Sequence, residues 1–172
     1  MAAGDIKIQY AASANLTVTN LAGIASSATW VVGWTSAYID NSSNLYMDYL
    51  ITGQFTVESA GLSAGEIRVY VYTELDDATV MDLFSSGTEG TEGTATITDT
   101  EIRDSGFVLA RAILTDTTAS RVYGFRAFSV ASLFGGICPR KFAIFVAQST
   151  GTTLETTGQQ ITQKGVFYNV AA

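Results

Sequence analysis

Alternation of apolar and polar side chains with a period of two is the pattern that most constrains this chain. It is clearest in residues 45–58, where odd-numbered positions are mainly apolar and even-numbered positions mainly polar. Successive side chains of a β-strand point to opposite faces, so this period predicts a long strand with one buried face. We expect a bend at Gly53. The side chains expected in the core are Leu45, Met47, Tyr49, Ile51, Phe55 and Val57.

The same alternation, with many β-branched and aromatic residues, predicts strands along most of the chain. Helical periodicity is nearly absent, apart from one short helix expected from Asp77 to Gly87 and a helical turn within residues 129–134. The further strands are expected near residues 6–10, 16–19, 30–35, 67–72, 107–115, 121–125, 142–148 and 161–170.

Length and strand spacing together predict the architecture. The chain has 172 residues, the size of one domain, and no linker interrupts it. Many short strands joined by Gly-rich turns predict an all-β fold, an antiparallel β-sandwich, and about eight strands would make it jelly-roll-like. We therefore expect a single domain over residues 1–172, with residues 1–10 as a contacting N-terminal strand or arm.

Missing residue types exclude much side-chain chemistry. The sequence has no histidine, so Ser-His-Asp and Cys-His catalytic sites and Cys/His zinc sites cannot form within it. The single cysteine, Cys138, cannot form an internal disulfide and suits folding in a reducing cytoplasm. We expect Cys138 to be an inert, partly buried thiol. The chain is predicted not to be an enzyme, with no catalytic residues, no metal ligands and no cofactor.

Two groups of acidic residues leave alternatives open. They can be solvated loops, a calcium site, which needs several oxygen ligands, or a catalytic pair across a cleft. Neither group has the spacing of a calcium-binding loop, and calcium binding by residues 76–104 stays an open question. The groups are Asp76, Asp77 and Asp82, and Asp99, Glu101 and Asp104.

The charge of the chain argues against polyanionic partners. Its net charge is −7, its nine basic residues are scattered, and no apolar run approaches the roughly 20 residues of a membrane helix. We therefore expect neither a nucleic acid nor a membrane as partner. Charged residues make up only 15%, against about 25% in typical domains, and the mean hydropathy is positive. Such a chain is either an ordinary β-domain with Thr on its exposed strand faces or a subunit whose surface is covered by partner proteins.

Five segments carry a resemblance to known proteins: residues 4–11, 15–22, 33–40, 45–57 and 129–154. Taken together, they resemble a family of small head proteins of tailed bacteriophages, the capsid decoration or cement proteins. The resemblance implies a β-sandwich or jelly roll on the outside of a shell, made in the host cytoplasm and located in the virion. It implies binding to the major capsid protein, with self-association as a homotrimer or a dimer.

Two sets of residues are the candidate contacts for this role. Chain ends reach outwards easily, which favours Ile6, Ile8 and Tyr10. Aromatic residues are enriched at interfaces, which favours the second set, although its two Trp side chains can equally be core. The second set is Trp30, Trp34 and Tyr38.

Other functions remain as alternatives. Exposed aromatic side chains of the second set could stack on sugars, so the chain could instead be a glycan- or host-binding module of a head or tail fibre. A hydrolase that uses acidic pairs is a third hypothesis.

Overall fold

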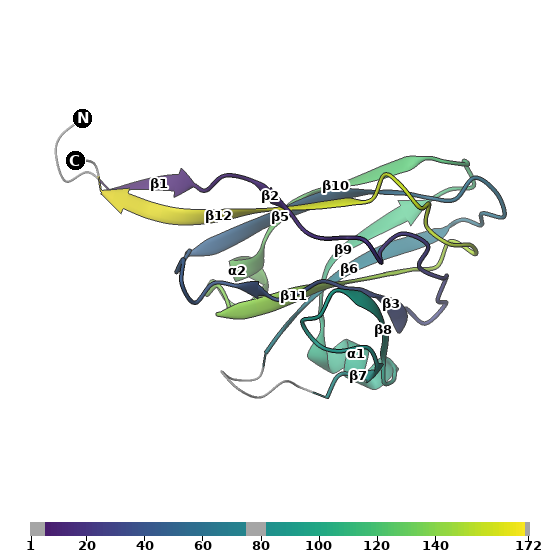
Figure 1. Ribbon diagram of the computed structural model, residues 1–172, viewed down its shortest axis with the longest axis horizontal. Coiled ribbons are helices and arrows are strands. Elements are labelled where there is room, and N and C mark those ends of the chain that lie inside the picture. Colours follow the sequence, from purple (N-terminus) through teal and green to yellow (C-terminus); the bar gives the residue numbers. More distant parts are fainter. Residues whose placement is uncertain (1–5, 75–81, 171–172) are drawn as a thin grey trace.

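The computed structural model describes residues 6–74 and 82–170, and two antiparallel β-sheets packed face to face make up most of them (Figure 1). The prediction of an all-β antiparallel sandwich is confirmed. Sheet A has the order β1 (Ile6–Tyr10), β12 (Gln160–Val170), β5 (Asp48–Thr56) and β10 (Val122–Ser129), with β2 (Ala14–Asn15) also on β12. Sheet B has the order β7 (Phe84–Ser86), β8 (Gly93–Ile97), β3 (Val32–Thr35), β11 (Lys141–Gln148), β6 (Gly65–Thr73) and β9 (Val108–Thr115), with β4 (Ile39–Asp40) on β11.

The order of the main strands is that of a jelly roll. The sequence β1-β12-β5-β10 in one sheet faces β3-β11-β6-β9 in the other. The chain crosses repeatedly between the sheets, so strands from opposite ends of the sequence become neighbours, as in two linked Greek keys. The last strand, β12, lies between β1 and β5 in sheet A. Among the described residues, no helix is long and apolar enough to span a lipid bilayer.

The main core fills the space between the two sheets. Alternation in β5 and β6 sends one set of side chains into it, including Ile51 and Phe55 from sheet A and Val69 and Val71 from sheet B. Phe55 is fully buried and stacks on Phe125 with ring centroids 5.6 Å apart.

An insertion between β6 and β9 builds a second core on the outer face of sheet B. It contains β7, β8 and a short helix, α1 (Thr100–Gly106), and Figure 1 shows it below that sheet. Because this cluster covers its outer face, β11 is buried on both sides, whereas no comparable cluster of described residues covers the outer face of sheet A. The second core contains Tyr70, Tyr72, Leu83, Phe84, Ala95, Ile97, Phe107, Ala143, Phe145 and Ala147.

Some sequence predictions of elements are wrong. The helix expected from Asp77 to Gly87 lies partly outside the described residues, and its described part contains strand β7, because Phe84 pairs with β8 and packs into the second core. Residues 16–19 form no strand. The predicted turn within residues 129–134 is confirmed as α2 (Val130–Leu133), whose N-cap is Ser129.

The long strand begins later than its alternation predicts. Tyr49, Ile51, Phe55 and Val57 are buried as expected, but Leu45 is 77% exposed and Met47 is 38% exposed. These two residues lie in the loop before β5, so the strand period no longer directs their side chains inward. At Gly53 a Cβ atom would lie 2.4 Å from the backbone oxygen of Gln160, so close approach of β12 accounts for the glycine.

Candidate functional site

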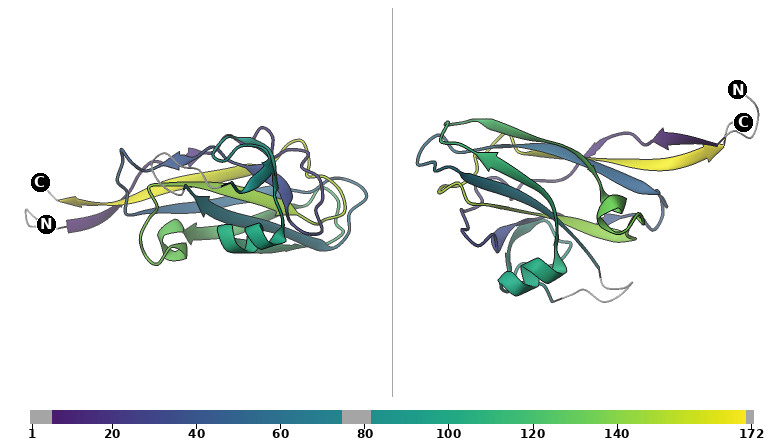
Figure 2. Two further views of the ribbon diagram at one scale, coloured as in Figure 1. Left: turned by 90° about the horizontal axis from the view of Figure 1, so that it is seen from below. Right: turned by 180° about the vertical axis from the view of Figure 1, so that it is seen from behind.

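The clearest candidate surface is a two-stranded ribbon formed by β1 and the end of β12. β1 pairs with residues 166–170, from Tyr10 opposite Val166 to Ile6 opposite Val170. β5 accompanies β12 only as far as Val166. The ribbon therefore projects past the sandwich, as Figures 1 and 2 show, and its tip has no third described strand.

One face of this ribbon is apolar and uncovered. Directly opposite residues of an antiparallel pair share a face, so Ile6, Ile8, Tyr10 and Tyr168 lie together. Their exposed fractions are 69%, 56%, 59% and 59%. A two-stranded ribbon alone is at best marginally stable in water, and this one leaves its large apolar side chains in solvent. Such a face is typical of a binding surface.

The opposite face of the ribbon is polar and partly packed. Asn169 Nδ2 donates to Gln9 Oε1 at 3.0 Å, and Lys7 lies on the same face. The Phe167 ring stacks on Tyr46, with centroids 5.6 Å apart. The two faces therefore differ in chemistry, and the apolar one continues the outer face of sheet A.

The outer edge of β1 is also unpaired among the described strands. Ala11 N donates to Gly165 O at 2.9 Å, which sets the alternation of hydrogen bonds along this pair. The backbone groups of Ile6, Ile8 and Tyr10 consequently point away from β12. An open edge of this kind is a template for adding a strand from another chain.

Trp34 belongs to the core rather than to a contact surface. It is 0% exposed between the sheets, and its Nε1 donates to Glu92 Oε1 at 2.7 Å. Glu92 also accepts from the backbone and side-chain nitrogens of Asn20, at 2.8 and 2.7 Å. The interface assignment of Trp34 is therefore corrected, because packing and hydrogen bonding hold this side chain inside the domain.

Trp30 and Tyr38 lie on a different side of the molecule from the ribbon. Both are partly buried against the second core on sheet B. The Arg68 guanidinium lies 3.6 Å from the Trp30 ring centroid, a cation–π contact. Tyr38 packs beside Tyr72, and burial, followed by the charge of nearby groups, raises the pKa of Tyr38 well above its usual range. The structure thus does not bring the two predicted contact sets together.

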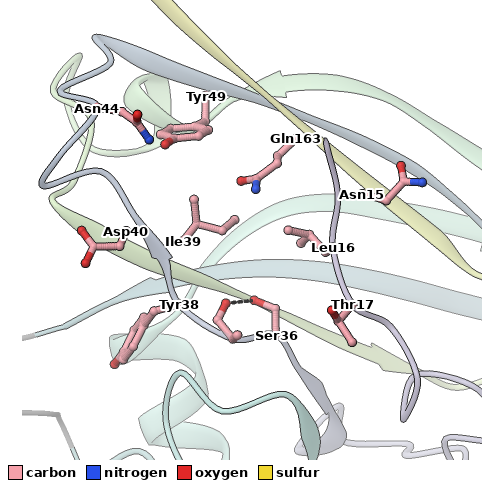
Figure 3. A pocket seen from close by; sticks show the side chains of 11 residues that line it. Asn15, Leu16, Thr17, Ser36, Tyr38, Ile39, Asp40, Asn44, Tyr49 and Gln163 are labelled. Atoms are coloured by element: carbon pink, nitrogen blue, oxygen red, sulfur yellow. Dashed lines mark hydrogen bonds between the residues drawn. The ribbon is translucent and has the colours of Figure 1, made fainter. Parts of the chain in front are cut away.

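A polar pocket lies between the sheets, near the edge where β2 meets β12, and Figure 3 shows its side chains. Its volume is about 310 Å³. The sequence interpretation missed it, although Gln163 shares a strand face with the buried Ile161 and this interruption of an apolar face was a usable signal. The lining residues are Asn15, Leu16, Thr17, Ser36, Ala37, Tyr38, Ile39, Asp40, Asn44, Tyr49 and Gln163.

The predicted acidic groups do not converge in the described part of the chain. Asp99 caps α1, accepting from Ile102 N at 2.7 Å, and Asp104 pairs with Arg103. Asp82 is exposed, while Asp76 and Asp77 lie outside the described residues. Within residues 6–74 and 82–170, no group of three acidic or cysteine side chains could hold a metal ion.

Cys138 is partly buried, as expected. Burial, and secondarily the charge of Asp48, raises the pKa of its thiol to about 11. The thiol therefore stays protonated at neutral pH and is a poor nucleophile.

No protein-family model matches this chain, and no curated protein sequence matches it.

Proposed function

We propose that this chain is a structural subunit that attaches to the outside of a protein shell. In the specific form we propose, it is a capsid decoration protein of a phage virion that bridges neighbouring major capsid subunits. The observation that supports this proposal is the projecting β1–β12 ribbon, with its apolar face and its open strand edge.

The ribbon offers two complementary modes of attachment. A partner strand on the β1 edge would accept and donate the backbone hydrogen bonds that Ile6, Ile8 and Tyr10 direct outwards. A partner surface over the apolar face would remove large side chains from water, each worth about 1.5–3 kcal/mol when fully buried. Stable interfaces bury about 1,200–2,000 Å², so the outer face of sheet A is expected to join the contact.

Charge distribution is compatible with this role. The ribbon, residues 6–10 and 164–170, holds Lys7 and Lys164 but none of the sixteen acidic residues, although the whole chain carries −7. The ribbon is thus suited to a neutral or acidic partner surface. We expect a homotrimer, with a dimer as the alternative, and sedimentation equilibrium distinguishes them.

The test uses capsids stripped of this protein, with wild-type protein added back. Wild-type protein should bind and raise the temperature at which virions release DNA. Ile8→Lys should bind at least tenfold more weakly, because it places a charge in the apolar face. Leu114→Lys, an equally polar change at an exposed position on β9, is the matched control and should bind like wild type. Absence of the protein from purified virions, or full binding by Ile8→Lys, contradicts the proposal.

The glycan-binding alternative loses its original basis. It relied on exposed Trp30, Trp34 and Tyr38, but Trp34 is buried and the other two are partly buried against the second core. The sugar-stacking role is therefore not proposed for these residues.

A further inference from the structure

We infer that the pocket between β2, β4 and β12 binds one ring of a neutral, polyhydroxylated ligand, a sugar unit. This inference does not depend on the proposed attachment to a capsid, because the pocket and the ribbon apolar face share no residue.

Gln163 is the first observation that points to a ligand. It is opposite Ile51 in the β12–β5 pair, so its side chain faces the space between the sheets. Figure 3 shows it reaching into the pocket between Tyr49 and Leu16. Its Oε1 is buried and has no hydrogen-bond partner among the described residues. Buried polar atoms in proteins are nearly always hydrogen-bonded to protein or to water, so this amide oxygen can accept from a group that enters the pocket.

The other polar groups select the class of ligand. Amide and hydroxyl side chains line the pocket, including Asn44, Thr17 and Tyr49, and each type can both donate and accept. Burial raises the pKa of Tyr49, which keeps its hydroxyl a neutral donor. Sugar hydroxyls also donate and accept at once, so they match such a lining.

Charge in the pocket argues against an anion. Asp40 lines it, and no Lys or Arg does. Hydrogen bonds from Ser42 lower the pKa of Asp40, with Ser42 N donating to Oδ1 at 2.7 Å, so the carboxylate is ionised at neutral pH. Lys141 and Arg140 are close enough to help lower the pKa of Asp40, but neither lines the pocket, so a phosphate or carboxylate ligand would find no lining cation there.

The volume of the pocket and its apolar wall limit the ligand to a single ring. About 310 Å³ is at the lower end of the roughly 300–1,000 Å³ of ligand pockets. Leu16 and Ile39 supply an apolar wall that suits the C–H face of a sugar ring. The rest of an oligosaccharide would extend into solvent.

The experiment is a titration of the ¹⁵N-labelled protein with glucose, galactose, mannose and N-acetylglucosamine, each followed by amide chemical shifts. At least one sugar should shift the amides of residues 15–17, 38–44 and 163 at millimolar concentration. Gln163→Leu should weaken this binding about tenfold or more, the loss expected for a buried hydrogen bond. This variant should still fold, because it places an apolar side chain at an inward position.

The matched control is Gln54→Leu, the same change on β5 at a position that faces outwards from sheet A. It should bind the sugar like wild type. The inference is overturned if no sugar shifts these amides, if Gln163→Leu binds as tightly as wild type, or if inorganic phosphate or methylammonium binds there and the sugars do not.

Discussion

Phe55 is a large side chain in the main core, and its packing can be tested by a single substitution. Phe55 is fully buried, and its ring stacks on Phe125 from the neighbouring strand. Phe55→Ala should lower the free energy of unfolding by about 3–5 kcal/mol, through lost transfer energy and the cavity it leaves. Urea denaturation measures the change, and Leu114→Ala, at a position 74% exposed, is the control that should cost little. A small effect of Phe55→Ala would mean that the register of β5 is wrong.

Asp116 should make stability depend on pH in the acid range. It accepts from Tyr123 Oη and Thr118 N, at 2.7 and 2.8 Å, and pairs with Arg121. These contacts, led by the Tyr123 hydroxyl, lower the pKa of Asp116 to about 2 from its usual 3.8. Because the folded pKa lies below the unfolded one, this stabilisation is complete above about pH 4 and is lost as pH falls towards 2.

Asp116→Asn tests this dependence. The variant should be less stable than wild type at pH 6, and the difference should shrink as pH falls from 4 to 2. Urea midpoints at several pH values give the comparison. A difference that stays constant over this range would show that the carboxylate charge has no part in it.

Burial of a side chain could be predicted from the sequence where apolar and polar residues alternate with a period of two. Ile51 and Phe55 follow the alternation of β5 and are buried as predicted. No alternation predicts the burial of Trp34, because its indole N–H donates a hydrogen bond to Glu92, a residue 58 positions away in the sequence. For Gln163 in the candidate pocket the alternation with Ile161 was a usable signal, and the pairing of Gln163 with Ile51 of β5 shows that it faces inwards.

At the scale of elements, β3 depends on a glycine that allows close packing. A Cβ on Gly33 would lie 2.2 Å from Val146 O and 2.8 Å from the Phe145 ring. Gly33→Ala should therefore force the β3 and β11 backbones apart and cost about 1–3 kcal/mol. Gly93→Ala, in the next strand β8, meets no atom within 4 Å and should stay within about 0.5 kcal/mol of wild type. Thermal melts of both variants measure this, and equal melting temperatures would contradict the expected clash.

Strands were easier to predict than the insertion that covers sheet B. The expected strands near residues 107–115, 142–148 and 161–170 correspond to β9, β11 and β12, because each has a long run of strand-forming residues. β7 has only three residues and exists because Phe84 packs on Phe145 of β11 and on Phe107, the C-cap residue of α1. Tertiary contacts of this kind leave no local pattern, so the sequence predicts a helix from Asp77 to Gly87 and not strand β7.

At the scale of the whole molecule, stability should depend on neither a disulfide nor a bound metal ion. The chain has one cysteine, and its described part brings no metal-ligand group together. Melting temperatures with and without EDTA, and with and without reductant, should therefore nearly coincide. The measurement also covers the acidic residues 76 and 77, and a shift of more than a few degrees with EDTA would support a calcium site.

The position of the final strand has a consequence for how the protein folds during synthesis. β12 lies between β1 and β5, so sheet A cannot be completed until β12 has left the ribosome. Until then β1 and β5 have exposed edges and no shared neighbour, a state prone to pairing with other nascent chains. Pairing of residues near opposite ends of the sequence also gives a high contact order, which slows folding. Sheet A is therefore expected to assemble only after β12 has been synthesised, with β1 and β5 protected until β12 docks.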